Sequence, residues 1–327
     1  MRRISELINE AGASRSVPLA GHPFRPGEKN KVSILALGDV GTTMLIGLRL
    51  MGSDVISEIG ICDIKRENCE RLVREINQIR YPDGTHNMPP VNIVDEEELF
   101  DADVFIFCAS RGVSDLGKEK DPGFDVRMAQ LDANREIIGH YAKLARDAGF
   151  EGLIAVVSDP VDNLCAAFMD ASGLQAWQFR GYGLGVMNAR AAYYAERDAR
   201  FSMYAEEGRA FGPHGKDLVI ANSITDYDDE LSRELTALAT GANLEVRSLG
   251  FKPYIAPAMS SAAISILLTL RGEWNYGSLY LGDESRGAFL GLRSRYDRNK
   301  WEYEDPELPE RLYQRIRKAY IRLCDIR

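Results

Sequence analysis

Short apolar runs alternate with longer helix-like stretches along the chain from about residue 30 onward. The strands predicted from the apolar runs cover 32–37, 56–64, 91–94, 103–110 and 153–158. Helical patterns separate them, and the longest covers 127–148. Strands that are apolar along their whole length and alternate with helices are typical of a parallel sheet covered on both faces. The pattern therefore predicts a doubly wound α/β domain over about residues 30–170.

Two further parts flank this predicted domain. The first 30 residues show a short amphipathic helix at "ISELINEA" and then a linker rich in Gly and Pro. The later part mixes helix-like segments with β-rich ones: helices at 188–207, 258–271 and from Pro309 onward, and β-rich stretches at 217–224 and 244–250. We expect an N-terminal extension (1–30), a doubly wound domain (31–172) and an α+β domain (173–327).

The charge balance argues against some classes of binding partner. The formal net charge is -9 over 327 residues, so the long-range field repels nucleic acid and anionic membrane surfaces. The apolar runs are far shorter than the roughly 20 residues that cross a bilayer, and the start of the chain is too polar for a signal peptide. We expect a soluble, cytoplasmic protein without nucleic-acid or membrane partners.

The cysteines give no sign of a structural cross-link or a metal site. There are five, an odd number, and they are widely spaced without a C-x-x-C pair. Such usage argues against a disulfide framework and against zinc. We expect buried free thiols and no metal.

A Gly-rich turn follows the first predicted strand. In "ALGDVGTT", Gly38 and Gly41 match the last two glycines of the dinucleotide-binding fingerprint of Rossmann-type domains, and Ala36 replaces the first. Gly38 would let the backbone approach a pyrophosphate, which the start of the following helix attracts, and Gly41 would let that helix pack on the strand. Asp39 and Val40 lie between them and are candidate cofactor contacts. A tight turn that binds no nucleotide is the plainer alternative.

An acid follows the second predicted strand at the position that selects the nucleotide. Asp63 lies 25 residues beyond Gly38, where a carboxylate accepts hydrogen bonds from the adenosine ribose. The carboxylate would repel a 2′-phosphate, so the sequence favours NAD as the cofactor. Lys65 and Arg66 lie close by and keep NADP open.

Seven motifs after residue 30 appear in the order that is typical of one enzyme family. They are the Gly-rich turn, "DADVFIFCASRG", "R-x6-N-x-x-I-I" at 127–138, "VVSDPVD", "GVMNAR", "GPHG" and "PYIAPAMSSAA". Together they make the chain resemble the NAD-dependent lactate/malate dehydrogenase family. The resemblance implies a Rossmann-type doubly wound sheet followed by an α+β substrate domain, and a homodimer or homotetramer.

The resemblance also assigns roles to residues of this chain. It implies that Arg127, seven residues before Asn134, polarises the substrate carbonyl, and that Arg190 binds the substrate carboxylate with its two-pronged guanidinium. It implies that His214 transfers the proton, a role that suits a group titrating near neutrality. Asn134 and Ser158 match cofactor-binding positions. For His214, a purely structural place in a turn is the alternative.

Two departures from the family pattern concern the surroundings of His214. The aspartate that normally pairs with the histidine is replaced by Met187, and Asp159 stands where the family has an asparagine facing the substrate oxygen. An acid lost on one side and gained on another could leave the site with the same charge, with Asp159 orienting His214. Alternatively, Asp159 could recognise a substrate amine or imine.

A third departure concerns substrate selection. The loop "SRGVSDLGKEKDPGFDVR" is longer than expected, and its Lys120 matches the position that selects the substrate side chain, where a lysine would suit a second carboxylate. A solvated loop charge is the alternative. Ile255 falls in a region that lines the substrate pocket in the family and suggests an apolar wall. The longer loop and the apolar wall both favour a substrate bulkier than lactate or malate.

These inferences predict an NAD-dependent oxidoreductase that acts on a 2-hydroxy or 2-oxo carboxylic acid. Two other functions remain open on the same fold. An imine or amino-acid reductase is suggested by Asp159, and a non-catalytic NAD-binding protein by Met187.

Overall fold

The computed structural model describes residues 1–13, 15–82, 84, 87–111 and 126–327, the side chains of 126–130 excepted. Its elements are η1 (Ile4–Glu6), α1 (Leu7–Glu10), β1 (Asn30–Leu35), α2 (Asp39–Met51), β2 (Ile56–Cys62), α3 (Arg66–Asn77), β3 (Val91–Ile93), η2 (Glu96–Glu98), β4 (Val104–Phe107), α4 (Val126–Asp147), β5 (Leu153–Val156), α5 (Val161–Ser172), η4 (Ala176–Gln178), β6 (Phe179–Gly181), α6 (Leu184–Ala195), η5 (Ala199–Phe201), α7 (Tyr204–Glu207), β7 (Arg209–Phe211), β8 (Val219–Ala221), α8 (Asp229–Ser248), η6 (Pro257–Ile264), α9 (Ser265–Leu270), β9 (Asn275–Gly282), β10 (Gly287–Asp297), β11 (Lys300–Tyr303) and α10 (Glu310–Ile326).

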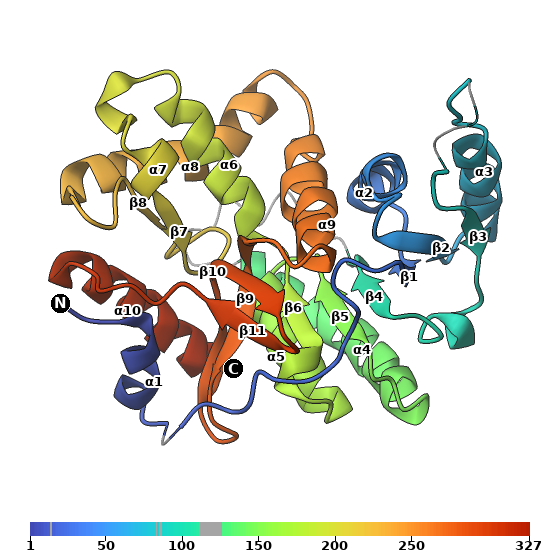
Figure 1. Ribbon diagram of the computed structural model, residues 1–327, viewed down its shortest axis with the longest axis horizontal. Helices are drawn as coiled ribbons and strands as arrows, with labels where there is room; N and C mark the ends of the chain where they lie inside the picture. The colour runs from blue at the N-terminus through green and yellow to red at the C-terminus, as the bar shows by residue number, and fades with distance from the viewer. Residues whose placement is uncertain (14, 83, 85–86, 112–125) are drawn as a thin grey trace.

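One nine-stranded mixed sheet forms the centre of the molecule, in the order β11-β10-β9-β6-β5-β4-β1-β2-β3. All pairings from β3 to β6 are parallel, and β9, β10 and β11 continue the sheet with antiparallel pairings. In Figure 1, α4 and α5 lie on one side of the sheet, and α2 and α9 on the other. The predicted Rossmann-type α/β fold is confirmed. The predicted boundary at residue 172 stays a prediction; β5 and β6, which lie on either side of it, pair within the one sheet.

The alternation of side chains along the strands divides the interior in two. In β4, Val104 and Ile106 face the cluster that contains Leu267 of α9, while Phe105 and Phe107 face the cluster on α4 and α5. Both faces are apolar because helices cover both, which explains why the strands read as unbroken hydrophobic runs.

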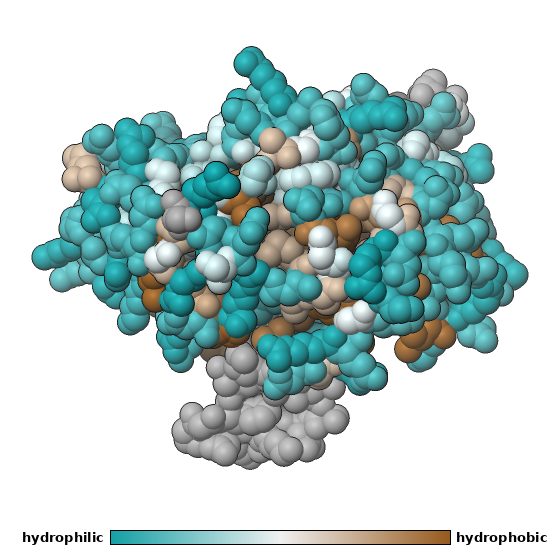
Figure 2. Space-filling view, turned by 90° about the horizontal axis from the view of Figure 1, so that it is seen from below, coloured by the Kyte–Doolittle hydropathy of each residue, from teal (hydrophilic) through white to brown (hydrophobic). Residues whose placement is uncertain are grey.

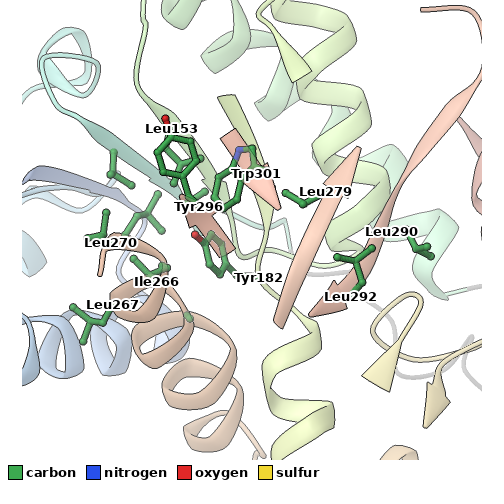
Figure 3. Close-up of a cluster of buried hydrophobic side chains, with 14 of the residues drawn as sticks. Leu153, Tyr182, Ile266, Leu267, Leu270, Leu279, Leu290, Leu292, Tyr296 and Trp301 are labelled. Atoms are coloured by element: carbon green, nitrogen blue, oxygen red, sulfur yellow. The ribbon is translucent and has the colours of Figure 1, made fainter. Parts of the chain in front are cut away.

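An aromatic group packs where the sheet turns from parallel to antiparallel. The rings of Tyr296 and Trp301 meet edge to face with centroids 5.2 Å apart, and Figure 3 shows Tyr182 close to them. The Tyr182 hydroxyl donates to Thr269 of α9 at 3.1 Å. This packing fixes α9 against the strands that end at the candidate site.

The N-terminal extension is packed against the body of the protein. Ile4 and Leu7 are fully buried, and Glu10 accepts hydrogen bonds from Tyr313 and Arg317 of α10. From α1 the chain runs across the lower side of the molecule to β1 (Figure 1). Seen from below, that side is mostly hydrophilic, with apolar side chains showing near its middle (Figure 2).

Two expectations for the second half were wrong, and one feature was missed. Residues 244–250, expected as β-rich, lie in or directly after α8, because Leu235 and Ala239 bury one face of that helix while Leu244 is exposed. The helix expected over 188–207 breaks after Ala195 into α6, η5 and α7. The antiparallel strands β9 to β11 were not predicted at all.

Candidate functional site

The ends of four parallel strands bring the predicted site residues together. The Gly-rich turn follows β1, Asp63 follows β2, the segment 108–111 follows β4, and Ser158 and Asp159 follow β5. The carboxyl ends of parallel strands meet at one edge of the sheet, which is where ligands bind in open α/β folds.

The turn after β1 leaves room for a phosphate. A Cβ added at Gly38 would meet nothing within 4 Å, whereas one added at Gly41 would lie 2.1 Å from the Ala36 carbonyl oxygen. Gly41 is therefore required by packing, while Gly38 keeps open space at the N-terminus of the 13-residue helix α2. Ala36 adopts a left-handed conformation, with φ 72°, which the usual glycine would adopt without strain. This geometry fits a dinucleotide pyrophosphate.

A cavity of about 910 Å³ continues from the turn along the strand ends. Asp63 lines it, and its carboxylate accepts hydrogen bonds from the N–H groups of Leu37 (2.7 Å) and Lys65 (2.9 Å). These bonds hold the carboxylate at the position where an adenosine ribose would meet it. Ile137 and Tyr141 of α4 supply an apolar wall suited to an adenine ring.

The basic residues near Asp63 differ in availability. Arg66 donates to Asp95 at 2.7 Å, so its guanidinium is engaged on the neighbouring segment, whereas Lys65 lines the cavity. At the helix start, Lys252 lies 3.3 Å from the Asp39 carboxylate and offsets a charge that would oppose a pyrophosphate.

A second, smaller cavity of about 220 Å³ adjoins the first, and Ser110 lines both. His214 lies in its wall, with Nδ1 3.1 Å from Oδ1 of Asp159. The imidazole is mostly buried, with 17% of the side chain exposed, and the carboxylate is about half exposed. The structure thus places a carboxylate beside His214, although Met187 stands at the position where the resemblance implies an acid.

The two predicted cofactor contacts beside this pair bond to the chain itself. Asn134, fully buried in α4, accepts from the Arg111 N–H at 2.8 Å and donates to the Asp159 carbonyl at 3.3 Å. Ser158 donates to the Ala109 carbonyl at 2.7 Å. These bonds fix the segments after β4 and β5, and thereby the position of Asp159. Ser158 also lines the small cavity together with Val40.

Arg190 lies buried on α6 without an ion pair to any acidic side chain of the described chain. Its guanidinium donates to Asn243 of α8 and lies 3.6 Å from the Met187 sulfur. Burial lowers the pKa of Arg190, because the charged form loses its hydration. A buried guanidinium held by neutral groups is suited to receive an anion.

Among the described residues, neither Arg190 nor Ile255 lines the small cavity. Ile255 is 63% exposed and does not line it, although Pro257 and Ser261 two and six residues later do. Arg127 is placed in the first turn of α4, but its side chain, like the whole of Lys120, lies outside the described residues.

Sequence reasoning missed several residues of the cavity wall. Ser261 donates to the Gly183 carbonyl at 2.7 Å and accepts from the Val186 N–H at 2.8 Å, which locks η6 to the start of α6. Cys108 also faces the cavity, and burial raises the pKa of its thiol to about 12. The "CAS" and "MSSAA" motifs that contain Cys108 and Ser261 were visible, but nothing in them indicated which residue faces the cavity.

Within the described part of the chain there is no cluster of metal-ligating side chains. In the same residues, no helix combines the length and the apolar character needed to cross a membrane.

The fold and the site thus define a dinucleotide-binding α/β protein, in which a carboxylate–imidazole pair lies beside the cofactor cavity. Residues 30–181 match the NAD binding domain of lactate/malate dehydrogenases. This matched segment of the chain therefore resembles the NAD-binding domain of that family. The predicted cofactor, NAD, is confirmed by this match.

Individual proteins are similar to the chain in sequence or in fold. An L-lactate dehydrogenase of Mesomycoplasma hyopneumoniae is 26% identical over 196 residues, 59% of this chain and 58% of that protein, so the match spans less than two thirds of that relative. A lactate dehydrogenase from a Medee basin deep-sea metagenome library has a similar fold, with a TM-score of 0.73 and 19% identity over 91% of this chain and 98% of the other. The minor L-lactate dehydrogenase of Enterococcus mundtii gives a TM-score of 0.72 and 23% identity, over 91% and 97%.

Proposed function

We propose that the protein is an NAD-dependent oxidoreductase that transfers a hydride between nicotinamide and a 2-hydroxy or 2-oxo carboxylic acid. The observation that carries the proposal is the 3.1 Å contact between His214 and Asp159 in a cavity that adjoins the dinucleotide site. A proton donor beside the cofactor is what carbonyl reduction requires in addition to hydride.

Each proposed catalytic group has one task. The bound cofactor supplies or accepts the hydride at the substrate's C2. In the reduction, protonated His214 gives its proton to the carbonyl oxygen, which becomes the hydroxyl, and Asp159 stabilises the charged imidazole beforehand. Arg127 polarises the carbonyl, and Arg190 binds the carboxylate.

The proposed cofactor contacts lie along the same edge of the sheet. We propose that the N–H groups at Gly38, Asp39 and Val40 face the pyrophosphate, with Gly41 supporting the turn, and that Asp63 binds the ribose. Asn134 and Ser158 support the nicotinamide end by fixing the segment that carries Asp159.

Reduction of an imine is the second candidate function. The Asp159 carboxylate is 48% exposed toward the cavity, and a carboxylate there suits a cationic iminium better than an anion. The same residue cannot be fully engaged by both His214 and a substrate cation, so the two functions predict different responses to ammonium.

Substrate size and assembly are further parts of the proposal. Lys120 would select a second carboxylate, and Ile255 would form an apolar wall on closure of the site around a substrate bulkier than lactate. Exposed Ile46, Leu50 and Met51 on α2 support a homodimer or homotetramer that covers this helix. The free cysteines suit the reducing cytoplasm.

An NADH-oxidation screen with a panel of 2-oxo acids, with and without ammonium, tests the proposal. We expect turnover of at least one 2-oxo acid without ammonium, and a loss of about 100-fold or more in His214→Asn. Turnover that requires ammonium would support the imine function instead. Tight NADH binding without turnover of any substrate in the panel would contradict both.

A further inference from the structure

A polar groove of about 760 Å³ lies between α10, α8 and the start of β8, apart from both cavities of the candidate site. Its wall carries four basic and three acidic side chains: Arg233, Arg311, Arg315, Lys318, Asp217, Asp229 and Glu310. In Figure 1, α8 and α10 flank the strands β7 and β8.

Of the three acidic side chains of the groove, two form ion pairs and the third accepts a hydrogen bond from an amide. Asp217 lies 3.0 Å from Arg322, and Asp229 lies 2.8 Å from Arg233. Glu310 accepts a hydrogen bond from Gln314 at 2.7 Å.

Three of the basic side chains, by contrast, form no ion pair with an acidic side chain anywhere in the described residues. They are Arg311, Arg315 and Lys318, at positions i, i+4 and i+7 of α10, so they project from one side of the helix. The opposite side of α10, including Leu312 and Ile316, is buried. The stripe therefore faces the groove because the apolar side fixes the rotation of the helix.

Arg315 is held in place by neutral groups. Its guanidinium donates to the Tyr227 hydroxyl at 2.8 Å and to the Thr236 hydroxyl at 3.2 Å. The Tyr227 hydroxyl in turn donates to Asp229 at 2.7 Å. A half-buried guanidinium that is oriented by hydroxyl groups and forms no direct ion pair within the described residues is ready for a charge-assisted bond to an anion.

The spacing of the stripe indicates the kind of ligand. Seven residues of helix separate Arg311 from Lys318 by about 10 Å along the axis. At this distance Arg311 and Lys318 can each pair with a different charged group of an anion that carries two or three of them. The net charge of the chain opposes anions at long range, so a ligand must gain its affinity from these direct contacts.

We propose that this groove is a binding site for a small multivalent anion, a di- or tricarboxylate or a phosphorylated metabolite. Arg315 provides the fixed, two-pronged contact, and Arg311 and Lys318 neutralise the remaining charge. The site is independent of the proposed oxidoreductase activity.

Calorimetric titration of the full chain tests the proposal, with citrate, pyrophosphate and acetate as probes at low salt and with saturating NADH present to fill the cofactor cavity. We expect citrate or pyrophosphate to bind with one-to-one stoichiometry, and acetate not to saturate. Binding of citrate would indicate a carboxylate ligand, and binding of pyrophosphate would indicate a phosphorylated one. Binding should persist in Arg190→Gln, which removes the proposed substrate anchor.

Two pairs of substitutions with the same charge change localise the binding. Arg311→Gln with Lys318→Gln should weaken it by roughly tenfold or more, since two charge-assisted contacts are lost. Arg74→Gln with Lys143→Gln, on α3 and α4, should leave the affinity within twofold. Arg315→Gln should act like the first pair, provided that its circular dichroism shows a native fold. Absence of saturable binding of both multivalent probes, or equal affinity in the two pairs, would overturn the proposal.

Discussion

Under the proposed function, the carboxylate that orients His214 comes from the segment after β5 and not from α6. Asp159 reaches the imidazole at 3.1 Å, and Asn134 fixes the backbone of Asp159. Met187 is nonpolar and contacts Arg190, so α6 carries the proposed anion anchor but supplies no acid to His214. Acid and anchor thus lie on separate elements.

Replacing the acid tests this arrangement at the level of one residue. Asp159→Asn should lower kcat by about 10- to 100-fold, because the amide does not stabilise a charged imidazole. KM for a 2-oxo acid should stay the same or fall, since a charge that repels the substrate is removed. Adding Met187→Asp should restore part of kcat. A rise in KM with unchanged kcat in Asp159→Asn, measured by steady-state kinetics, would assign the residue to substrate binding.

The nucleotide preference rests on another single residue. Asp63→Ser should weaken NADH binding by roughly tenfold and improve NADPH binding, because the change removes a ribose acceptor and a charge that repels the 2′-phosphate. Fluorescence titration of both nucleotides measures the two affinities. Tighter binding of NADPH than of NADH by the unchanged protein would show that Lys65 outweighs Asp63.

The sequence could predict the contact of Asp159 with His214, but not the contact of Arg190 with Asn243. The relation of Asp159 to His214 was predictable as a hypothesis, since two motifs departed from the family pattern in complementary ways. The bond from Arg190 to Asn243 was not, because it depends on the packing of α6 on α8. No local pattern encodes which positions of two helices meet.

At the scale of elements, the turn between β1 and α2 combines one strained residue with one indispensable glycine. Ala36→Gly should stabilise the protein by up to about 1 kcal/mol, because Ala36 pays a steric cost at φ 72°. Gly41→Ala should destabilise it by about 2 kcal/mol or more, since the new Cβ would lie 2.1 Å from the Ala36 oxygen.

Urea denaturation of both turn variants measures these effects, and Ala167→Gly within α5 is the control. That helical substitution should cost about 1 kcal/mol, as glycine normally does. A cost of the same size in Ala36→Gly would show that the left-handed conformation is not strained.

The parallel strands were predictable because burial on both faces leaves unbroken apolar runs. The antiparallel strands β9 and β10 were not, since glycines interrupt them. Those glycines are packing positions: a Cβ at Gly277 would lie 2.6 Å from Nε of Arg180, and one at Gly291 would lie 2.4 Å from the Gly212 carbonyl oxygen. Burial lowers the pKa of Arg180 to about 10, and Ser294 and Asn275 accept its hydrogen bonds. Gly277 leaves the space that the Arg180 guanidinium needs, and it thereby interrupts the apolar pattern from which a strand would be predicted.

At the scale of the whole molecule, half-buried charged side chains connect the N-terminal extension to α10. Burial acts to raise the pKa of Glu10, but hydrogen bonds from Arg317 and Tyr313 and the charge of Arg2 outweigh it, and the pKa is lowered. A lowered carboxyl pKa stabilises the fold above the ordinary value of 4.5, and this contribution is lost as the pH falls through the folded-state pKa.

The pH dependence of one variant checks this linkage. Glu10→Gln should be less stable than the unchanged protein at pH 7, and the difference in free energy of unfolding should shrink as the pH falls below about 4.5. Glu67→Gln, at an exposed position of α3, should show no such trend. A difference for Glu10→Gln that stays constant from pH 7 to pH 3.5 would mean that its charge does not hold the extension.

The central claim is that this site moves a hydride from NADH to C2 of a 2-oxo acid while His214 gives the proton. Mass spectrometry of the product formed with NADH deuterated at C4 on either face tests it most directly. For one of the two labels we expect a 2-hydroxy acid with one deuterium at C2, formed without ammonium and far more slowly by His214→Asn. A product without deuterium at C2 from either label, or deuterium found only in an amino acid formed in the presence of ammonium, would contradict the claim.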